Sequence, residues 1–219
     1  MFPKRLSQGY QAFLAGRFAN ERSRYRALGE LGQQPDILII GCCDSRVSPE
    51  IIFDAGPGEM FVVRNVANLV PPYQPDSAYH GTSAAIEFAV NGLQVRHIVV
   101  LGHASCGGIR SFYDGAEPLS PGDFIGKWMS QIAPVAESLD AAGSGGEGSG
   151  ERATRLKRLE LAVVEHSLAN LMTFPYIRRR VEAGEMALHG AYFGVATGLL
   201  FVRDPATGRF EAVTEDAPA

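Results

Sequence analysis

The sequence predicts an α/β fold: a central, mostly parallel β-sheet flanked by helices, with a helical arm at the N-terminus. Three observations lead to this prediction. Short apolar runs alternate with helix-like segments, the order that a parallel sheet with helices on its faces requires. The chain has 219 residues, 46% of them hydrophobic, enough to bury one sizeable core. Two apolar runs lead directly into polar residues at 42–46 and 103–106, where open α/β sheets bind ligands.

Residues 5–31 are predicted to form two amphipathic helices that are broken near Gly16. Four apolar residues share one helical face: Leu6, Tyr10, Phe13 and Leu14. Such an arm covers apolar surface, either on its own sheet or on another subunit, and the sequence favours neither. We therefore divide the chain into a helical arm, residues 1–34, and a single α/β domain, residues 35–219.

Within the domain, turn residues separate the predicted elements. Strands are predicted at 38–41, 60–64, 97–102, 188–195, 199–202 and 210–213. Helices are predicted from Pro49, over 83–90, after Gly108, over 121–140, up to 172 and over 176–183. The Gly- and Ser-rich segment 143–150 has the composition of a flexible linker or loop.

Charge and hydropathy exclude several classes of partner. The formal net charge is −4, which gives no electrostatic reason to expect nucleic acid or an anionic membrane. No apolar run approaches the roughly 20 residues that a membrane span needs. The N-terminal residues are not followed by the apolar segment of a signal peptide. We therefore expect a cytoplasmic protein.

The chain has three cysteines, Cys42, Cys43 and Cys106. An odd number with two adjacent members is a poor disulfide framework, so metal binding or reactivity is expected. If the strands that end at Cys42 and at His103 are parallel neighbours, they bring Cys42, His103 and Cys106 together. Side chains alternate between the faces of a strand, so only one of Cys42 and Cys43 should reach this place.

Two thiols and an imidazole are zinc ligands, and three protein ligands with one open position are typical of a catalytic zinc. Asp44 lies two residues after Cys42, where a carboxylate can ligate the metal or accept a hydrogen bond from metal-bound water. Arg46 can hold that carboxylate bidentately and keep it off the metal. The alternative interpretation is that neither residue serves a metal: Asp44 would only form a turn or cap a helix, and Arg46 would only make an ion pair at the surface.

At this point the sequence resembles a known family. The motifs Cys42-Cys43-Asp44-Ser45-Arg46 and His103-Ala104-Ser105-Cys106-Gly107-Gly108 resemble those of the β-class carbonic anhydrases. Residues 57–73 and 81–87 are similar to the plant-like branch of that family. The resemblance covers about residues 30–203.

The resemblance implies reversible hydration of carbon dioxide to bicarbonate and a proton, by attack of zinc-bound hydroxide. One Zn²⁺ per subunit would be held by Cys42, His103 and Cys106, with water as the fourth ligand. Asp44 would accept a hydrogen bond from that water, and Arg46 would fix Asp44.

The resemblance also implies a substrate pocket and a homo-oligomer, at least a dimer. Gln33 would donate an amide hydrogen to a substrate oxygen, either within its chain or across a subunit boundary. Phe61 and Val66 would line the apolar carbon dioxide pocket. Gly107 opens a Gly-Gly pair that either cradles an anion or makes a tight turn. Phe88 stands where the plant-like branch often has tyrosine, so one hydroxyl near the substrate is absent.

Two alternatives remain open at the level of sequence. The same site would serve a carbon disulfide or carbonyl sulfide hydrolase if its pocket admitted those substrates. A non-catalytic zinc-binding or redox-sensing module is the other alternative. Asp44 and Arg46 argue against that module, because a structural zinc site has a fourth protein ligand.

Overall fold

A six-stranded β-sheet forms the centre of the molecule. The computed structural model describes residues 1–76, 79–141 and 149–214. The strands are β1 (Ile37–Cys42), β2 (Met60–Asn65), β3 (His97–His103), β4 (Ala187–Phe193), β5 (Leu200–Arg203) and β6 (Phe210–Ala212). They lie in the order β2-β1-β3-β4-β5-β6; the first four are parallel, and β5 and β6 are antiparallel additions at one edge. This confirms the predicted fold class, including the hairpin between the last two strands.

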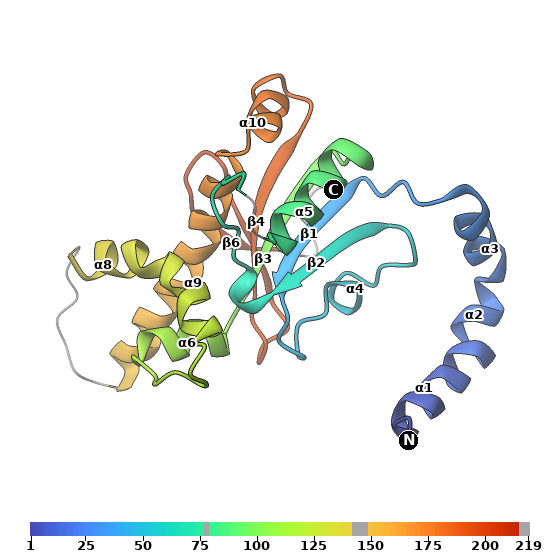
Figure 1. The fold of residues 1–219 in the computed structure, drawn as a ribbon, viewed down its shortest axis with the longest axis horizontal. Helices are drawn as coiled ribbons and strands as arrows, with labels where there is room; N and C mark the ends of the chain where they lie inside the picture. The colour runs from blue at the N-terminus through green and yellow to red at the C-terminus, as the bar shows by residue number, and fades with distance from the viewer. Residues whose placement is uncertain (77–78, 142–148, 215–219) are drawn as a thin grey trace.

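Helices cover the two faces of the sheet unequally, as Figure 1 shows. The domain helices are α4 (Pro49–Ile52), α5 (Gly81–Glu87), α6 (Gly107–Tyr113), α7 (Phe124–Met129), α8 (Ala133–Ala141), α9 (Ser149–Leu171) and α10 (Pro175–Glu182). Alternate residues of β1 and β3, such as Ile40 and Val100, are fully buried in one core with residues of α5, α9 and α10. The opposite face has a smaller buried cluster around Ile39 and Leu101, beside α4.

The helix predicted over 121–140 is divided in the structure. Asp123 begins α7 by accepting a hydrogen bond from the Gly126 N–H at 3.1 Å. A 3₁₀ turn at Ser130–Ile132 then separates α7 from α8. Pro134 lies in the first turn of α8, where a missing N–H costs no hydrogen bond, whereas it would break a continuous helix. Of the predicted linker 143–150, residues 143–148 lie outside the described residues, and α9 begins at Ser149.

The N-terminal arm projects from the domain (Figure 1). It consists of α1 (Lys4–Ala15), α2 (Arg17–Asn20) and α3 (Arg22–Leu31), none of which contains a buried residue. The predicted break at Gly16 is confirmed, and a second break lies at Glu21. Among the described residues, no helix is long and apolar enough to cross a membrane.

Candidate metal centre

Two neighbouring strands deliver the central side chains of the site. Strands β1 and β3 pair in parallel, so their carboxyl ends, at Cys42 and His103, meet at one edge of the sheet. The loop after His103 returns Cys106 to the same place. The ligand atoms of these three residues all lie within 4.8 Å of one another, and all three residues are buried. The structure thus brings together the three residues that the sequence selected.

Close packing holds β3 at this position. A Cβ atom on Gly102 would lie 2.6 Å from Cγ2 of Val164 in α9, so any larger residue would push the strand and the helix apart. Gly102 directly precedes His103. The close approach of α9 therefore requires a glycine directly before His103.

The His103 ring has one nitrogen engaged and one available. Nδ1 lies 3.0 Å from the carbonyl oxygen of Ala104, which accepts a hydrogen bond when the proton is on Nδ1. Nε2 is buried, and no described residue hydrogen-bonds to it. A backbone carbonyl on one ring nitrogen fixes the tautomer that leaves the other nitrogen free for a metal.

The cysteines differ in their surroundings. Cys42 is 5% exposed, whereas Cys43 is exposed and faces away, as strand alternation predicts. A hydrogen bond from the Cys106 thiol, together with the backbone N–H groups of Asp44 and Ala67, lowers the pKa of Cys42 despite its burial. The same hydrogen bond, together with burial, raises the pKa of Cys106. The thiolate form, which is the form that binds a metal, is therefore favoured at Cys42.

The donor set fits Zn²⁺. Zinc takes thiolate and imidazole ligands at about 2.0–2.3 Å in tetrahedral geometry, which separates ligand atoms by roughly 3.5 Å. The 4.8 Å upper limit here admits that arrangement. The buried, unpartnered Nε2 of His103 is a second indication, because such an atom normally has a partner in the folded protein.

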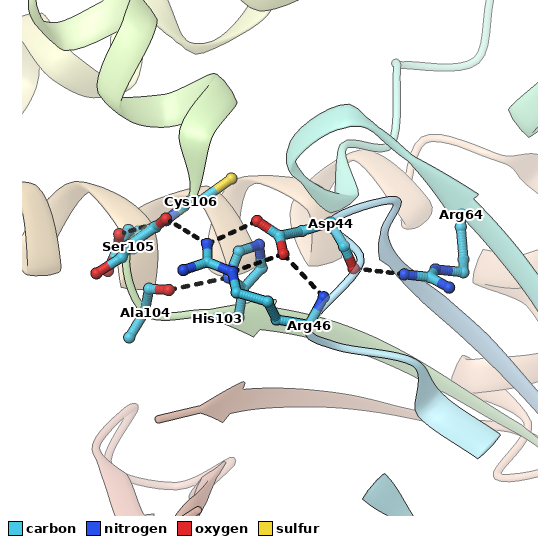
Figure 2. Close-up of polar contacts among 8 residues, drawn as sticks. Asp44, Arg46, Arg64, His103, Ala104, Ser105 and Cys106 are labelled. Atoms are coloured by element: carbon cyan, nitrogen blue, oxygen red, sulfur yellow. Dashed lines mark hydrogen bonds and ion pairs between the residues drawn. The ribbon is translucent and has the colours of Figure 1, made fainter. Parts of the chain in front are cut away.

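The guanidinium of Arg46 hydrogen-bonds to both carboxylate oxygens of Asp44, just after β1 (Figure 2). Its Nε donates to Oδ1 at 2.9 Å and its Nη2 to Oδ2 at 2.7 Å, while its backbone N–H also donates to Oδ1 at 3.0 Å. The hydrogen bond from Arg46 is the main reason that the pKa of Asp44 lies far below its usual range. Asp44 is therefore a fixed carboxylate that only accepts hydrogen bonds at neutral pH.

Two further groups hold the ligand loops, and the sequence analysis missed both. Arg64 donates from Nε to the carbonyl oxygen of Cys42 at 2.8 Å and from Nη2 to that of Asp44 at 2.6 Å, the latter drawn in Figure 2. Glu160, 5% exposed, accepts a hydrogen bond from the Cys106 N–H at 3.1 Å and one from the Tyr192 hydroxyl at 2.6 Å. Burial and then the Glu160 contact raise the pKa of Tyr192, so the phenol keeps its proton. For Arg64, the signal in the sequence was a charged residue at the end of an apolar strand. Glu160 gave no such signal, because its helix carries several other charged residues.

The predicted pocket residues fall into two groups. Val66 lies beside the centre, because a Cβ on Gly108 would lie 2.6 Å from its Cγ1. Gly107 is the first residue of α6, directly after Cys106. Phe61, by contrast, is paired with Leu38, four positions before Cys42 along the sheet, and it contacts Phe88 instead.

Gln33 lies farther still from the centre of its own chain. It is exposed and precedes β1, whose opposite end carries Cys42. Within one chain, the structure therefore brings neither Gln33 nor Phe61 to the metal centre.

Comparison with known proteins identifies this arrangement. The family model described as carbonic anhydrase matches residues 37–200, which include all three clustered residues. The chain belongs to the β-class carbonic anhydrases. Its Cys42-His103-Cys106 cluster is typical of the zinc site of that family.

This β-class carbonic anhydrase has relatives in plants and fungi. It is 36% identical over 188 residues to Beta carbonic anhydrase 5, chloroplastic, of Arabidopsis thaliana, covering 86% of this chain and 60% of that protein. The chain thus spans less than two thirds of that relative.

Among solved structures, the β-carbonic anhydrase CcaA matches with a TM-score of 0.84 at 28% identity, over 97% of this chain and 92% of that one. A tetrameric β-carbonic anhydrase of Sordaria macrospora matches with a TM-score of 0.74 at 30% identity, over 94% and 97%.

Proposed function

We propose that this β-class carbonic anhydrase catalyses the reversible hydration of carbon dioxide to bicarbonate and a proton, with one Zn²⁺ per chain. The observation that carries the proposal is a carboxylate, Asp44, fixed by Arg46 next to a cluster of three ligands. Within the described part of the chain, that cluster has no fourth His, Cys, Asp or Glu member. A structural zinc has four protein ligands, whereas a catalytic zinc keeps one position open.

In this proposal, the metal ligands, Asp44 and Arg46 have separate roles in the reaction. Cys42, His103 and Cys106 would hold Zn²⁺, which when bound would supply the Lewis acidity that makes a water nucleophilic near neutral pH. Asp44 accepts a hydrogen bond from the reacting oxygen and so orients its remaining proton away from the substrate. Arg46 occupies both carboxylate oxygens, which keeps Asp44 in that role and off the metal.

The substrate pocket is completed by a second copy of the chain. Val66 and Gly107 adjoin the centre of their own chain, and in this proposal they line the apolar side that carbon dioxide requires. Gln33 and Phe61 lie at the other end of the sheet from their own centre. If they serve the substrate, they serve it in the partner's site, so we propose at least a homodimer.

The arm supports this assembly. Helices α1 and α3 bury no residue, although α1 is amphipathic and carries the exposed apolar residues Leu6 and Tyr10. We propose that the arm, residues 1–34, is an extension that packs on a partner, while residues 35–219 form the catalytic domain. The Sordaria macrospora relative is described as tetrameric.

The reaction is tested by stopped-flow measurement of carbon dioxide hydration on protein of known zinc content. Activity should require zinc, disappear with a chelator and return when Zn²⁺ is added back. Zinc-loaded protein without hydration activity would refute the proposal. Assays with carbon disulfide and carbonyl sulfide on the same preparation test the alternative hydrolase, and a zinc protein inert to all three substrates would favour a binding module.

The shared site is tested by co-expressing two inactive variants, Cys42→Ser and Gln33→Ala. In a mixed dimer, the intact metal centre of the Gln33→Ala chain meets the intact Gln33 of its partner. Activity should therefore reappear in the mixture. If Gln33 served its own chain, no mixed species would be active.

We further propose a reducing compartment, the cytoplasm, as the location of this enzyme. The support is chemical: all three cysteines are free thiols, and two of them must remain reduced to hold zinc. Cell fractionation with detection of the chain tests this location, and recovery in an oxidising compartment would overturn it.

A further inference from the structure

The peptide bond between Ser105 and Cys106 is held from both sides. Nη2 of Arg46 donates to the carbonyl oxygen of Ser105 at 3.1 Å, as drawn in Figure 2. The N–H of the same peptide unit, which belongs to Cys106, donates to Oε1 of Glu160 at 3.1 Å. The Arg46 guanidinium and the Glu160 carboxyl group thus hydrogen-bond to the C=O and the N–H of one peptide unit, directly before the Cys106 side chain.

This peptide unit decides where the Cys106 sulfur points. Strand β3 ends at His103 and α6 begins at Gly107. Only two residues therefore separate His103 from Cys106, although both side chains must reach one ion. Ser105 has φ +58°, in the left-handed region that residues with a Cβ rarely adopt. A loop in such a conformation persists only where its surroundings hold it.

Glu160 is an unusual residue for its place. It lies on α9 beside Leu159 and one turn before Val163 and Val164, all of which are buried in apolar clusters. Burying a carboxylate there is unfavourable unless its oxygens are hydrogen-bonded. Both are: Oε1 accepts from the Cys106 N–H, and Oε2 accepts from the Tyr192 hydroxyl, which is itself 3% exposed.

We propose that Glu160, oriented by Tyr192, is a positioning residue that aims the Cys106 thiolate at the metal by fixing the Ser105–Cys106 peptide. The inference rests on the proposed function only in taking Cys106 as a zinc ligand. Arg46 acts on the same peptide from the other side, so it links the Asp44 carboxylate to the geometry of the ligand loop. Partners of this kind around metal ligands are worth about 10–100-fold in metal affinity.

The test compares four single variants and one double variant with the wild-type protein. Glu160→Leu removes the acceptor and leaves the Cys106 N–H without a partner, whereas Glu160→Gln keeps an acceptor oxygen and should rescue the site. Tyr192→Phe removes one hydroxyl with little change in shape. Asn170→Ala is the matched control, because Asn170 is also a buried polar residue of α9, but it bonds to the Val70 carbonyl.

Two readouts are independent of turnover. Zinc affinity is measured by competition with a chromophoric chelator, and the thiolate-to-metal charge-transfer and d–d bands are recorded after loading with Co²⁺. Glu160→Leu should bind Zn²⁺ at least about 10-fold more weakly and shift the Co²⁺ bands. Tyr192→Phe should lower affinity by a smaller factor and have no further effect in the Glu160→Leu background. Glu160→Gln and Asn170→Ala should resemble the wild type.

The proposal is overturned if Glu160→Leu keeps wild-type zinc affinity and an unchanged Co²⁺ spectrum. If Glu160→Leu does not fold, Tyr192→Phe decides: unchanged affinity and bands would equally reject the proposal. The outcome is separate from the hydration assay. Wild-type protein that binds zinc without hydrating carbon dioxide would refute the proposed activity, while the affinity series would still test the positioning role.

Discussion

Arg46 holds Asp44 through both carboxylate oxygens and also reaches the carbonyl of Ser105. Asp44 and Arg46 are only two residues apart in the sequence. The hydrogen bond from Arg46 to Ser105, however, reaches the loop that carries Cys106. The orientation of the carboxylate and the shape of the ligand loop therefore depend on one guanidinium. Two predictions follow from this coupling.

Replacing Asp44 with Asn should lower kcat/KM for carbon dioxide hydration by about 100-fold or more, because a positioned acceptor contributes about that much to proton-transfer chemistry. Zinc content should not change. The matched control is Asp36→Asn, since Asp36 forms a similar bidentate pair with Arg96, at 2.7 and 2.6 Å, at the other end of β1. An Asp44→Asn enzyme with full activity and full zinc would contradict the assigned role.

Replacing Arg46 with Ala should raise the pKa of Asp44 toward the ordinary value of an aspartate. In the wild-type protein, the hydrogen bond from Arg46 keeps the carboxyl group ionised until the pH falls far below neutral. Without Arg46, acidification should protonate Asp44 at a higher pH. The titration of the carboxyl group, followed by NMR on isotope-labelled protein, measures this shift. An Asp44 that titrates identically in Arg46→Ala and in the wild type would show that Arg46 does not control its protonation.

Lowering the pH should weaken the attachment of the arm to the domain. Arg24 of α3 donates to Oε1 of Glu59 and to the carbonyl of Pro57, both at 2.8 Å. The hydrogen bond from Arg24 lowers the pKa of Glu59, so the ion pair contributes fully above the ordinary pKa of a glutamate and its contribution is lost as the pH falls through the lowered value. Limited proteolysis with an acid-active protease, or hydrogen exchange corrected for pH, should show greater exposure of residues 1–34 at low pH.

At neutral pH, Arg24→Ala should have the same effect as acid. Arg26→Ala is the control, because Arg26 pairs only with Glu30 of its own helix among the contacts of the structure. Equal protection of the arm in both variants would show that another contact holds it. In an assembled dimer the partner can also protect the arm, so both measurements belong on protein of known oligomeric state.

Adding a methyl group at Gly102 should destabilise the domain by about 1–3 kcal/mol. The new Cβ would lie 2.6 Å from Val164 Cγ2, so β3 and α9 must separate, and His103 moves with the strand. Thermal or denaturant unfolding measures the loss. Gly29→Ala is the control: an added Cβ there meets nothing within 4 Å, and Ala favours the helix over Gly. Equal stability of Gly102→Ala and the wild type would exclude the predicted clash.

Most of the fold and the central cluster were predictable from local patterns. The apolar runs at 38–41 and 97–102 each end at a metal-type ligand, and parallel neighbours must bring those ends together. The choice of Cys42 over Cys43 also follows from the two-residue period of a strand. The division of 121–140 was not predicted, because the segment has a continuous helical pattern in which Pro134 is the one local signal of a new helix start.

The sequence by itself determined the succession of strands and helices along the chain and the Asp44–Arg46 pair, because each depends on spacing within a short segment. It also selected Cys42, His103 and Cys106 as the clustered residues, because two apolar runs end at ligand-type side chains and parallel pairing brings those ends together. Only the tertiary structure decided that Glu160 and Tyr192 hold the Cys106 peptide and that Gln33 and Phe61 lie away from their own centre. The physical reason is distance along the chain: Glu160 is 54 residues from Cys106, and a hydrogen bond over that separation exists only once α9 has packed on the sheet.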